Sequence, residues 1–134
     1  MSKNTNDRMT AAELKVARES LGLSGDWLAT HLGVNSRTVR EWEQGRRPVP
    51  DWVRLEVESL EQFTAELVGD VVERLMGVDE PEIVTYRNDN EYRTICSGVM
   101  FPASWHRAAC ARVAKEVPAL SIVYASDVAA AHAE

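Results

Sequence analysis

The sequence predicts a mainly α fold: a bundle of short helices containing a helix-turn-helix, one long connecting helix and a small α+β C-terminal subdomain. Three observations carry this prediction. Apolar residues recur at helical spacing as far as Met76, glycines directly follow the short helical stretches, and β-type segments occur only in the second half. The length of 134 residues, 45% hydrophobic and 27% charged, suits a small module with an appended subdomain.

The first helix is predicted after Thr10, because Thr10-Ala11-Ala12-Glu13 reads as a capping box. Its inner face carries Leu14, Ala17 and Leu21, and Gly22 ends it.

Two further short helices follow. One starts after Ser24 and ends at Gly33, and the next is capped by Asn35 and runs to about Gln44, before Gly45. The inner faces of these two helices are expected to carry Leu28, Ala29, Leu32, Val39 and Trp42. Because only three residues with a leading glycine join them, the pair predicts a helix-turn-helix.

A long helix from Asp51 to Met76 follows the stiff connector Arg46-Arg47-Pro48-Val49-Pro50. Its apolar stripe is expected at Val53, Val57, Leu60, Thr64, Leu67, Val71 and Leu75. Beyond Gly77 we expect strands at 82–86 and 121–124, a helix at 103–117, and either a helix, which we favour slightly, or a hairpin at 88–95.

These elements predict two domains and two tails. Residues 10–62 form a helix-turn-helix domain, and residues 63–126 form a small α+β subdomain that shares the long helix. Residues 1–9 and 127–134 are expected to be flexible tails, although the alanine-rich end can also be helical.

The net charge of −6 argues against a nucleic-acid binder, whose footprint is usually basic. The charge is uneven, however: residues 1–62 carry 9 basic and 10 acidic side chains, and residues 63–134 carry 6 and 11. One short stretch of the first half gathers four arginines: Arg37, Arg40, Arg46 and Arg47. These four arginines therefore form a local basic patch in a protein that is acidic as a whole.

The patch lies where a recognition helix would meet DNA. The first turn of the third helix would present Ser36, Arg37 and Thr38 to base edges. Arg37 can form a bidentate contact with the O6 and N7 of guanine. One turn later, Arg40 can reach a base or a phosphate and Glu41 can accept from cytosine. Phosphate contacts are expected from the side chains of Gln44, Arg46 and Arg47 and from the amides near Ser24 and Gly25.

The stretch from Leu23 to Gly45, LSGDWLATHLGVNSRTVREWEQG, closely resembles the helix-turn-helix of Cro/C1-type (Xre-family) DNA-binding proteins. The resemblance covers roughly residues 10–60. Its most specific part is Leu-x-x-x-Leu-Gly-Val, then x-x-x-Thr-Val, then Trp-Glu-x-Gly. It implies a lambda-repressor-like bundle with DNA as the partner.

The resemblance also implies roles for individual residues. Base reading falls on Ser36, Arg37 and Glu41, with Arg40 beside them, and an internal ion pair falls on Arg18 and Glu43. A glutamine that commonly touches phosphate in the family is replaced by Gly25, so that side-chain contact is lost.

The second half resembles the small YdiL-like proteins in its order of elements: long helix, strand, a helix with Trp105 near its start, and a closing strand. Those proteins pair a Cro/C1-like module with a dimerisation subdomain, which implies a homodimer. A small sheet of two strands also needs support from elsewhere.

Other chemistries find little support. His106 and Cys110 share a helix face with Cys96 upstream, but no fourth zinc ligand is evident, so packing is favoured over a metal site. No catalytic constellation or cofactor loop is present, so we expect neither an enzyme nor a cofactor. Without an apolar stretch of membrane length or a secretory signal, and with two reduced cysteines, the chain is expected in the cytoplasm.

Two functions are compatible with the sequence. The first is a sequence-specific regulator of transcription, a repressor, that binds double-stranded DNA as a homodimer on an inverted repeat through helix 36–44. The alternative is an antitoxin-like or adaptor module whose acidic C-terminal half binds a protein partner, a toxin or an effector.

Overall fold

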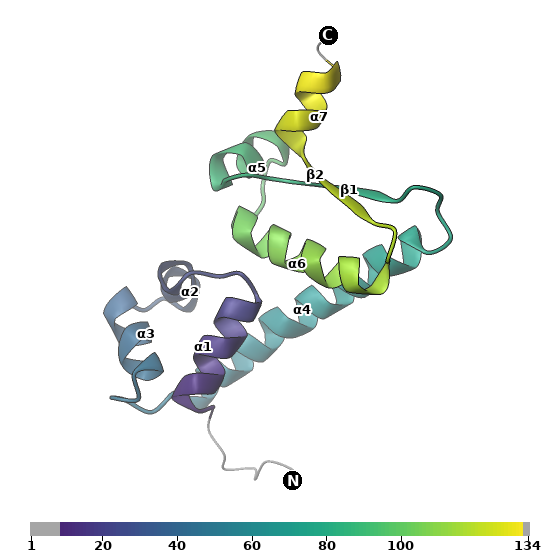
Figure 1. Ribbon diagram of the computed structural model, residues 1–134. Coiled ribbons are helices and arrows are strands. Elements are labelled where there is room, and N and C mark those ends of the chain that lie inside the picture. The colour runs from purple at the N-terminus through teal and green to yellow at the C-terminus, as the bar shows by residue number, and fades with distance from the viewer. Residues whose placement is uncertain (1–8, 133–134) are drawn as a thin grey trace. The chain divides into compact units, whose positions relative to one another are not determined.

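A computed structural model describes residues 9–132, and the chain divides into two units between Phe63 and Thr64 (Figure 1). The first unit contains α1 (Ala11–Ser20), α2 (Gly25–Leu32), α3 (Ser36–Glu43) and the first half of α4 (Asp51–Leu75). The second contains the rest of α4, then β1 (Glu82–Thr85), α5 (Asp89–Ile95), α6 (Ala103–Glu116), β2 (Ser121–Tyr124) and α7 (Ala125–His132). The predicted mainly α fold with a small α+β part is confirmed.

Side-chain caps set where the helices of the first unit begin. Thr10 and Glu13 form the predicted capping box: the Glu13 amide donates to Thr10 Oγ1 at 3.0 Å, and the Thr10 amide donates to Glu13 Oε1 at 2.9 Å. Ser24 caps α2 and Asn35 caps α3 in the same way, each accepting from the amide three residues later. Each cap satisfies one of the amides that the first turn of a helix leaves without an intrahelical partner.

The core of the first unit is built from the predicted inner faces. Leu32, expected to be inward, is only half-buried. Trp42 is buried, as expected, and meets the ring of Trp52 edge-on, with centroids 6.3 Å apart. The buried apolar side chains are Met9, Leu14, Ala17, Leu21, Leu23, Leu28, Ala29, Val39, Trp42, Val49, Val53, Val57 and Leu60.

Met9 is an exception to the expectation that residues 1–9 form a flexible tail, because its side chain is buried. It directly precedes the cap Thr10, and Leu14, the fourth residue of α1 counted from its start, is buried as well. These are the two positions of a hydrophobic staple, which fixes the direction in which the chain enters a helix. Residues 1–8 lie outside the described part of the chain.

The second unit pairs β1 with β2 in parallel, with Ile83 opposite Ile122 and Thr85 opposite Tyr124. Val68 of α4 packs with three buried side chains: Ala109, Val113 and Val117. The sequence predicted that Leu67 would be buried in the apolar stripe of α4, but Val68 is the buried residue and Leu67 is half-buried. Both residues lie on the broad apolar face of the helix, and α6 packs against the side that carries Val68.

Two open questions of the sequence are settled in the second unit. Residues 88–95 form the helix rather than the hairpin, because the Asn88 side chain accepts from the Glu91 amide at 2.8 Å and caps α5. The segment assigned to a flexible tail from residue 127 is helical through His132, as α7. Alanine favours this helix, and Arg87 anchors its first turn through a 2.7 Å ion pair with Asp127.

No helix within residues 9–132 combines the length and the hydropathy needed to cross a membrane.

Truncating Leu14, which is fully buried, should lower the free energy of unfolding by about 2–5 kcal/mol, because Leu14→Ala leaves a cavity in the first unit. Val16 on the same helix is 65% exposed, so Val16→Ala should change stability by less than about 0.5 kcal/mol. Urea denaturation of the full chain compares the two. Equal losses of unfolding free energy in the two variants would show that Leu14 is not part of a packed core.

Candidate DNA-binding surface

The turn between α2 and α3 is closed by backbone geometry. Gly33 ends α2 in the left-handed region, with φ of 73°, which favours glycine over residues with a side chain. The Val34 amide then donates to the Ala29 carbonyl at 3.0 Å, and Asn35 caps α3. The spacing of glycine and asparagine therefore sets the angle at which α3 leaves α2.

An ion pair holds the far end of α3 against α1. Arg18 Nε lies 2.7 Å from Glu43 Oε2, and Arg18 Nη2 lies 2.8 Å from Glu43 Oε1, so the pair is bidentate. Arg18 Nη1 also donates to the Leu23 carbonyl, at 3.0 Å, in the connection that leads to α2. The two side chains are only 14% and 10% exposed, and the hydrogen bond to Glu43 raises the pKa of Arg18. One guanidinium therefore ties α1, the start of α2 and the end of α3 together.

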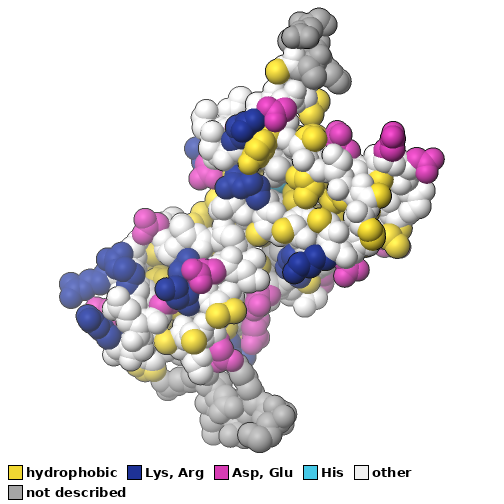
Figure 2. Space-filling view, in the orientation of Figure 1, with side chains coloured by type: hydrophobic (Ala, Val, Ile, Leu, Met, Phe, Trp, Pro, Cys, Tyr) yellow, Lys and Arg dark blue, Asp and Glu magenta, His cyan; other side chains and the backbone are white. Residues whose placement is uncertain are grey.

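The outward face of α3 is polar and basic. Val39 and Trp42 are buried, whereas Arg37, Arg40 and Gln44 are exposed. Arg46 and Arg47 are exposed directly after Gly45, and Figure 2 shows basic side chains gathered over this part of the first unit. The predicted basic residues thus lie on one surface.

Two of the predicted contact residues are already engaged in local caps, and a third is half-buried. Ser24 Oγ accepts from the Trp27 amide at 3.0 Å. Thr38 donates both its amide and its hydroxyl to Asn35 Oδ1, at 3.0 and 3.1 Å, and is half-buried. Ser36, the residue after this cap, is half-buried too. These side chains therefore offer less to an external partner than the arginines do.

Gly25, the first residue of α2, faces open space: a Cβ built there meets no atom within 4 Å. A side chain at this position is therefore sterically permitted.

Glu41 lies on the outer side of α3 as expected, but it is paired. Its Oε1 accepts from Arg37 Nε at 3.2 Å, and its Oε2 accepts from Arg47 Nη1 at 3.4 Å. The spacing of four residues between Arg37 and Glu41 is a sequence signal for this pair. The contact between Glu41 and Arg47 spans the turn at Gly45, so it could not be predicted from helical spacing.

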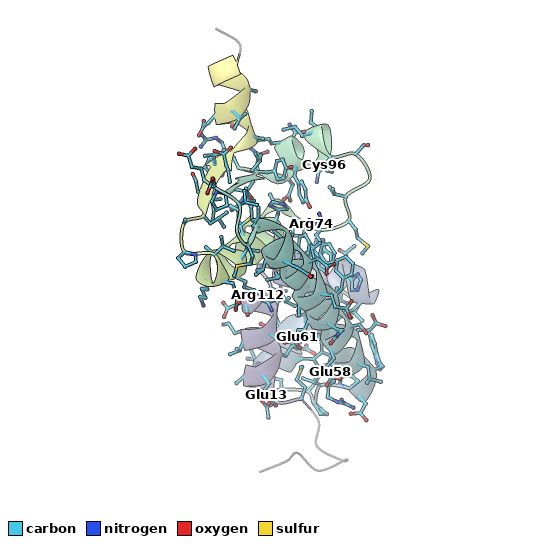
Figure 3. The ribbon with its side chains drawn as sticks, turned by 90° about the vertical axis from the view of Figure 1, so that its right-hand side faces the viewer. Glu13, Glu58, Glu61, Arg74, Cys96 and Arg112 are labelled. Atoms are coloured by element: carbon cyan, nitrogen blue, oxygen red, sulfur yellow. The ribbon has the colours of Figure 1, made fainter. Side chains whose placement is uncertain are left out.

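The residues considered for zinc already have contacts inside the second unit. His106 Nδ1 lies 2.8 Å from Thr85 Oγ1 and 3.6 Å from Cys110 Sγ, while Cys96 Sγ, at the end of α5 (Figure 3), lies 3.1 Å from the Tyr86 hydroxyl. Burial lowers the pKa of His106 and raises the pKa of Cys110, so both groups stay neutral near pH 7. Within residues 9–132, no three His, Cys, Asp or Glu side chains cluster as metal ligands do.

Comparison with known proteins places this surface in a family. Residues 11–60 match the family described as a helix-turn-helix domain. The chain is 34% identical over 85 residues to the Aca2 repressor of Pectobacterium phage ZF40, and the match covers 63% of this chain and 73% of that protein. The matched length exceeds the first unit, which ends at Phe63, so the likeness reaches into the second unit.

Neutralising Glu43 should destabilise the first unit. Glu43→Gln leaves the Arg18 charge largely buried without a counter-charge, so we expect unfolding to become easier by about 3 kcal/mol, the lower end for a broken buried pair. Glu58 on α4 (Figure 3), 51% exposed and paired with Arg54, is the control: Glu58→Gln should cost less than about 1 kcal/mol. Thermal or urea unfolding measures both, and a silent Glu43→Gln would disprove the tying role of Arg18.

Proposed function

Because the chain belongs to the Cro/C1-type (Xre) family of helix-turn-helix DNA-binding transcription regulators, we propose that it is a homodimeric repressor that reads an inverted-repeat DNA site with α3. The protein acts in the cytoplasm and has no catalytic activity of its own. The relative that it matches is itself a repressor by name.

The observation that carries this proposal is the exposed arginine in the first turn of α3. The Arg37 side chain is 81% exposed, while Val39 and Trp42 turn the opposite face of the helix into the core. A helix that enters the major groove presents its first turn to base edges, and an arginine there can bind the O6 and N7 of guanine. Arg37 is therefore the principal base-reading residue, and Ser36 and Arg40 complete the reading surface.

The remaining exposed polar groups suit the DNA backbone. Gln44, Arg46 and Arg47 leave the end of α3 where phosphates would pass, and the backbone amides at the start of α2, near Ser24 and Gly25, suit another phosphate. Contacts of this kind position the protein on the duplex without reading its sequence.

The second unit is proposed to dimerise the protein. Its sheet has two strands in the described residues, which is marginal in water without further packing. The likeness to the Aca2 repressor extends past the first unit, so the two proteins share at least part of the second unit. A twofold dimer would place two copies of α3 about 34 Å apart, matching half-sites one helical turn apart or a multiple of that.

Selection of bound sites from random duplex DNA with purified protein should return an inverted repeat. Arg37→Ala should relax the choice of base at one position in each half-site and weaken binding by about 1–3 kcal/mol, because the guanine fork is lost. A selection that returns no enriched motif would refute the proposed function.

Arg46→Ala should act differently, since Arg46 is assigned to phosphate. Binding should weaken by similar amounts on all sequences, and the slope of log K against log salt should fall by about one unit. Fluorescence anisotropy over a range of salt concentrations measures this. A sequence-dependent loss would mean that Arg46 reads bases.

Gly25→Gln should tighten binding, because open space at Gly25 lets an amide side chain reach the phosphate that the family contacts there. We expect a gain of about 1 kcal/mol, roughly fivefold, on specific and non-specific DNA alike. The salt slope should stay unchanged, since the amide adds no charge. Gly25→Ala is the matched control for helix propensity, and equal affinities of the two variants would count against a phosphate at this position.

A further inference from the structure

The Glu41 carboxylate holds two arginines of the candidate DNA-binding surface at once. One oxygen accepts from Arg37 Nε at 3.2 Å and the other from Arg47 Nη1 at 3.4 Å. The Glu41 side chain is 23% exposed, against 81% for Arg37 and 56% for Arg47. The acid therefore lies beneath the cations that face solvent.

Resting on the proposed function, we propose that Glu41 is a positioning residue for specificity: it does not read a base but holds the Arg37 guanidinium with its terminal amino groups facing the DNA.

The donor pattern of Arg37 supports this role. A guanidinium has five N–H donors, and Glu41 takes the one on Nε. Within residues 9–132, the Arg37 side chain makes no other hydrogen bond, so the four donors on its two terminal nitrogens are available. Two parallel donors at the tip of an arginine are what the O6 and N7 of guanine accept.

The state of Glu41 argues against direct reading of cytosine. Both of its oxygens already accept from arginines, so contact with a cytosine amine would compete with two existing ion pairs. An unpaired carboxylate in the major groove would also meet the field of the phosphates. Pairing with Arg37 and Arg47 reduces that repulsion.

Holding Arg37 also has an entropic consequence. A free arginine side chain carries about 2 kcal/mol of rotamer entropy, part of which is lost when it binds a base. At 81% exposure, Arg37 has little packing to restrict it, and the bond from Nε to Glu41 is the restraint that the structure provides. Glu41 thereby lowers the entropy lost on reading guanine.

Removing Glu41 should therefore have two opposite effects. Discrimination at the base pair read by Arg37 should fall, because the guanidinium is no longer held. Non-specific binding should rise, because one negative charge is gone and Arg47 is released toward phosphate.

The test measures a discrimination ratio: affinity for the selected site divided by affinity for the same site with the base pair read by Arg37 replaced. That base pair is the one at which Arg37→Ala loses preference. Glu41→Ala should lower the ratio by about twofold to fivefold and tighten non-specific duplex binding by about twofold to fivefold. Glu41→Gln should give an intermediate ratio, because the amide oxygen can still accept from Arg37 Nε. It also serves as the second variant if Glu41→Ala folds poorly.

The double variant separates positioning from direct reading. If Glu41 acts through Arg37, adding Glu41→Ala to Arg37→Ala should leave the preference at every other base pair of the half-site unchanged. A loss of preference at another base pair would show that Glu41 reads a base itself and would overturn the inference.

Glu58→Ala is the matched control, since it also removes an acid paired with an arginine four residues away, at 2.9 Å. It should leave the ratio unchanged. If the wild-type protein selects a motif but Glu41→Ala leaves the discrimination ratio unchanged, only the positioning role of Glu41 is overturned. If the wild-type protein selects no motif, the proposed function is overturned.

Discussion

The bidentate ion pair between Arg18 and Glu43 is the contact on which the geometry of the first unit depends. It joins α1 to the last turn of α3, and the third nitrogen of the same guanidinium reaches the Leu23 carbonyl before α2. Both partners are nearly buried, so each needs the other to offset its desolvation. The short helices are too small to hold their own orientation, and this pair fixes α3 while its outer face stays exposed.

The charged side chains of α3 and of the residues after it differ in burial and in pairing. Glu43 lies inside and is neutralised by Arg18, Glu41 lies at the edge and is shared by two arginines, and Arg40 and Arg46 lie exposed. The net charge of −6 therefore describes the chain as a whole and not the outer surface of α3. We expect such a protein to bind random DNA weakly, so base contacts and the proposed dimerisation would have to supply its affinity.

Local physics made most of the first unit predictable from sequence. Caps at Thr10, Ser24 and Asn35 and the glycine at Gly33 act within a few residues, so their signals stand next to one another in the chain. The burial of Val68 and the pairing of Glu41 with Arg47 could not be predicted in this way. Val68 is buried because α6 contacts its side of the apolar face, and Glu41 reaches Arg47 across the turn at Gly45.

The parallel pairing of β1 with β2 also bears on the order in which the protein is made. Residues 82 and 121 are partners, so the sheet can close only after α5 and α6 have been synthesised. The first three helices contact near neighbours in the chain, and local contacts of that kind form quickly. On a ribosome the first unit is thus complete early, while the sheet of the second unit closes last. The nascent chain therefore carries a folded helix-turn-helix before the unit that is proposed to dimerise has formed.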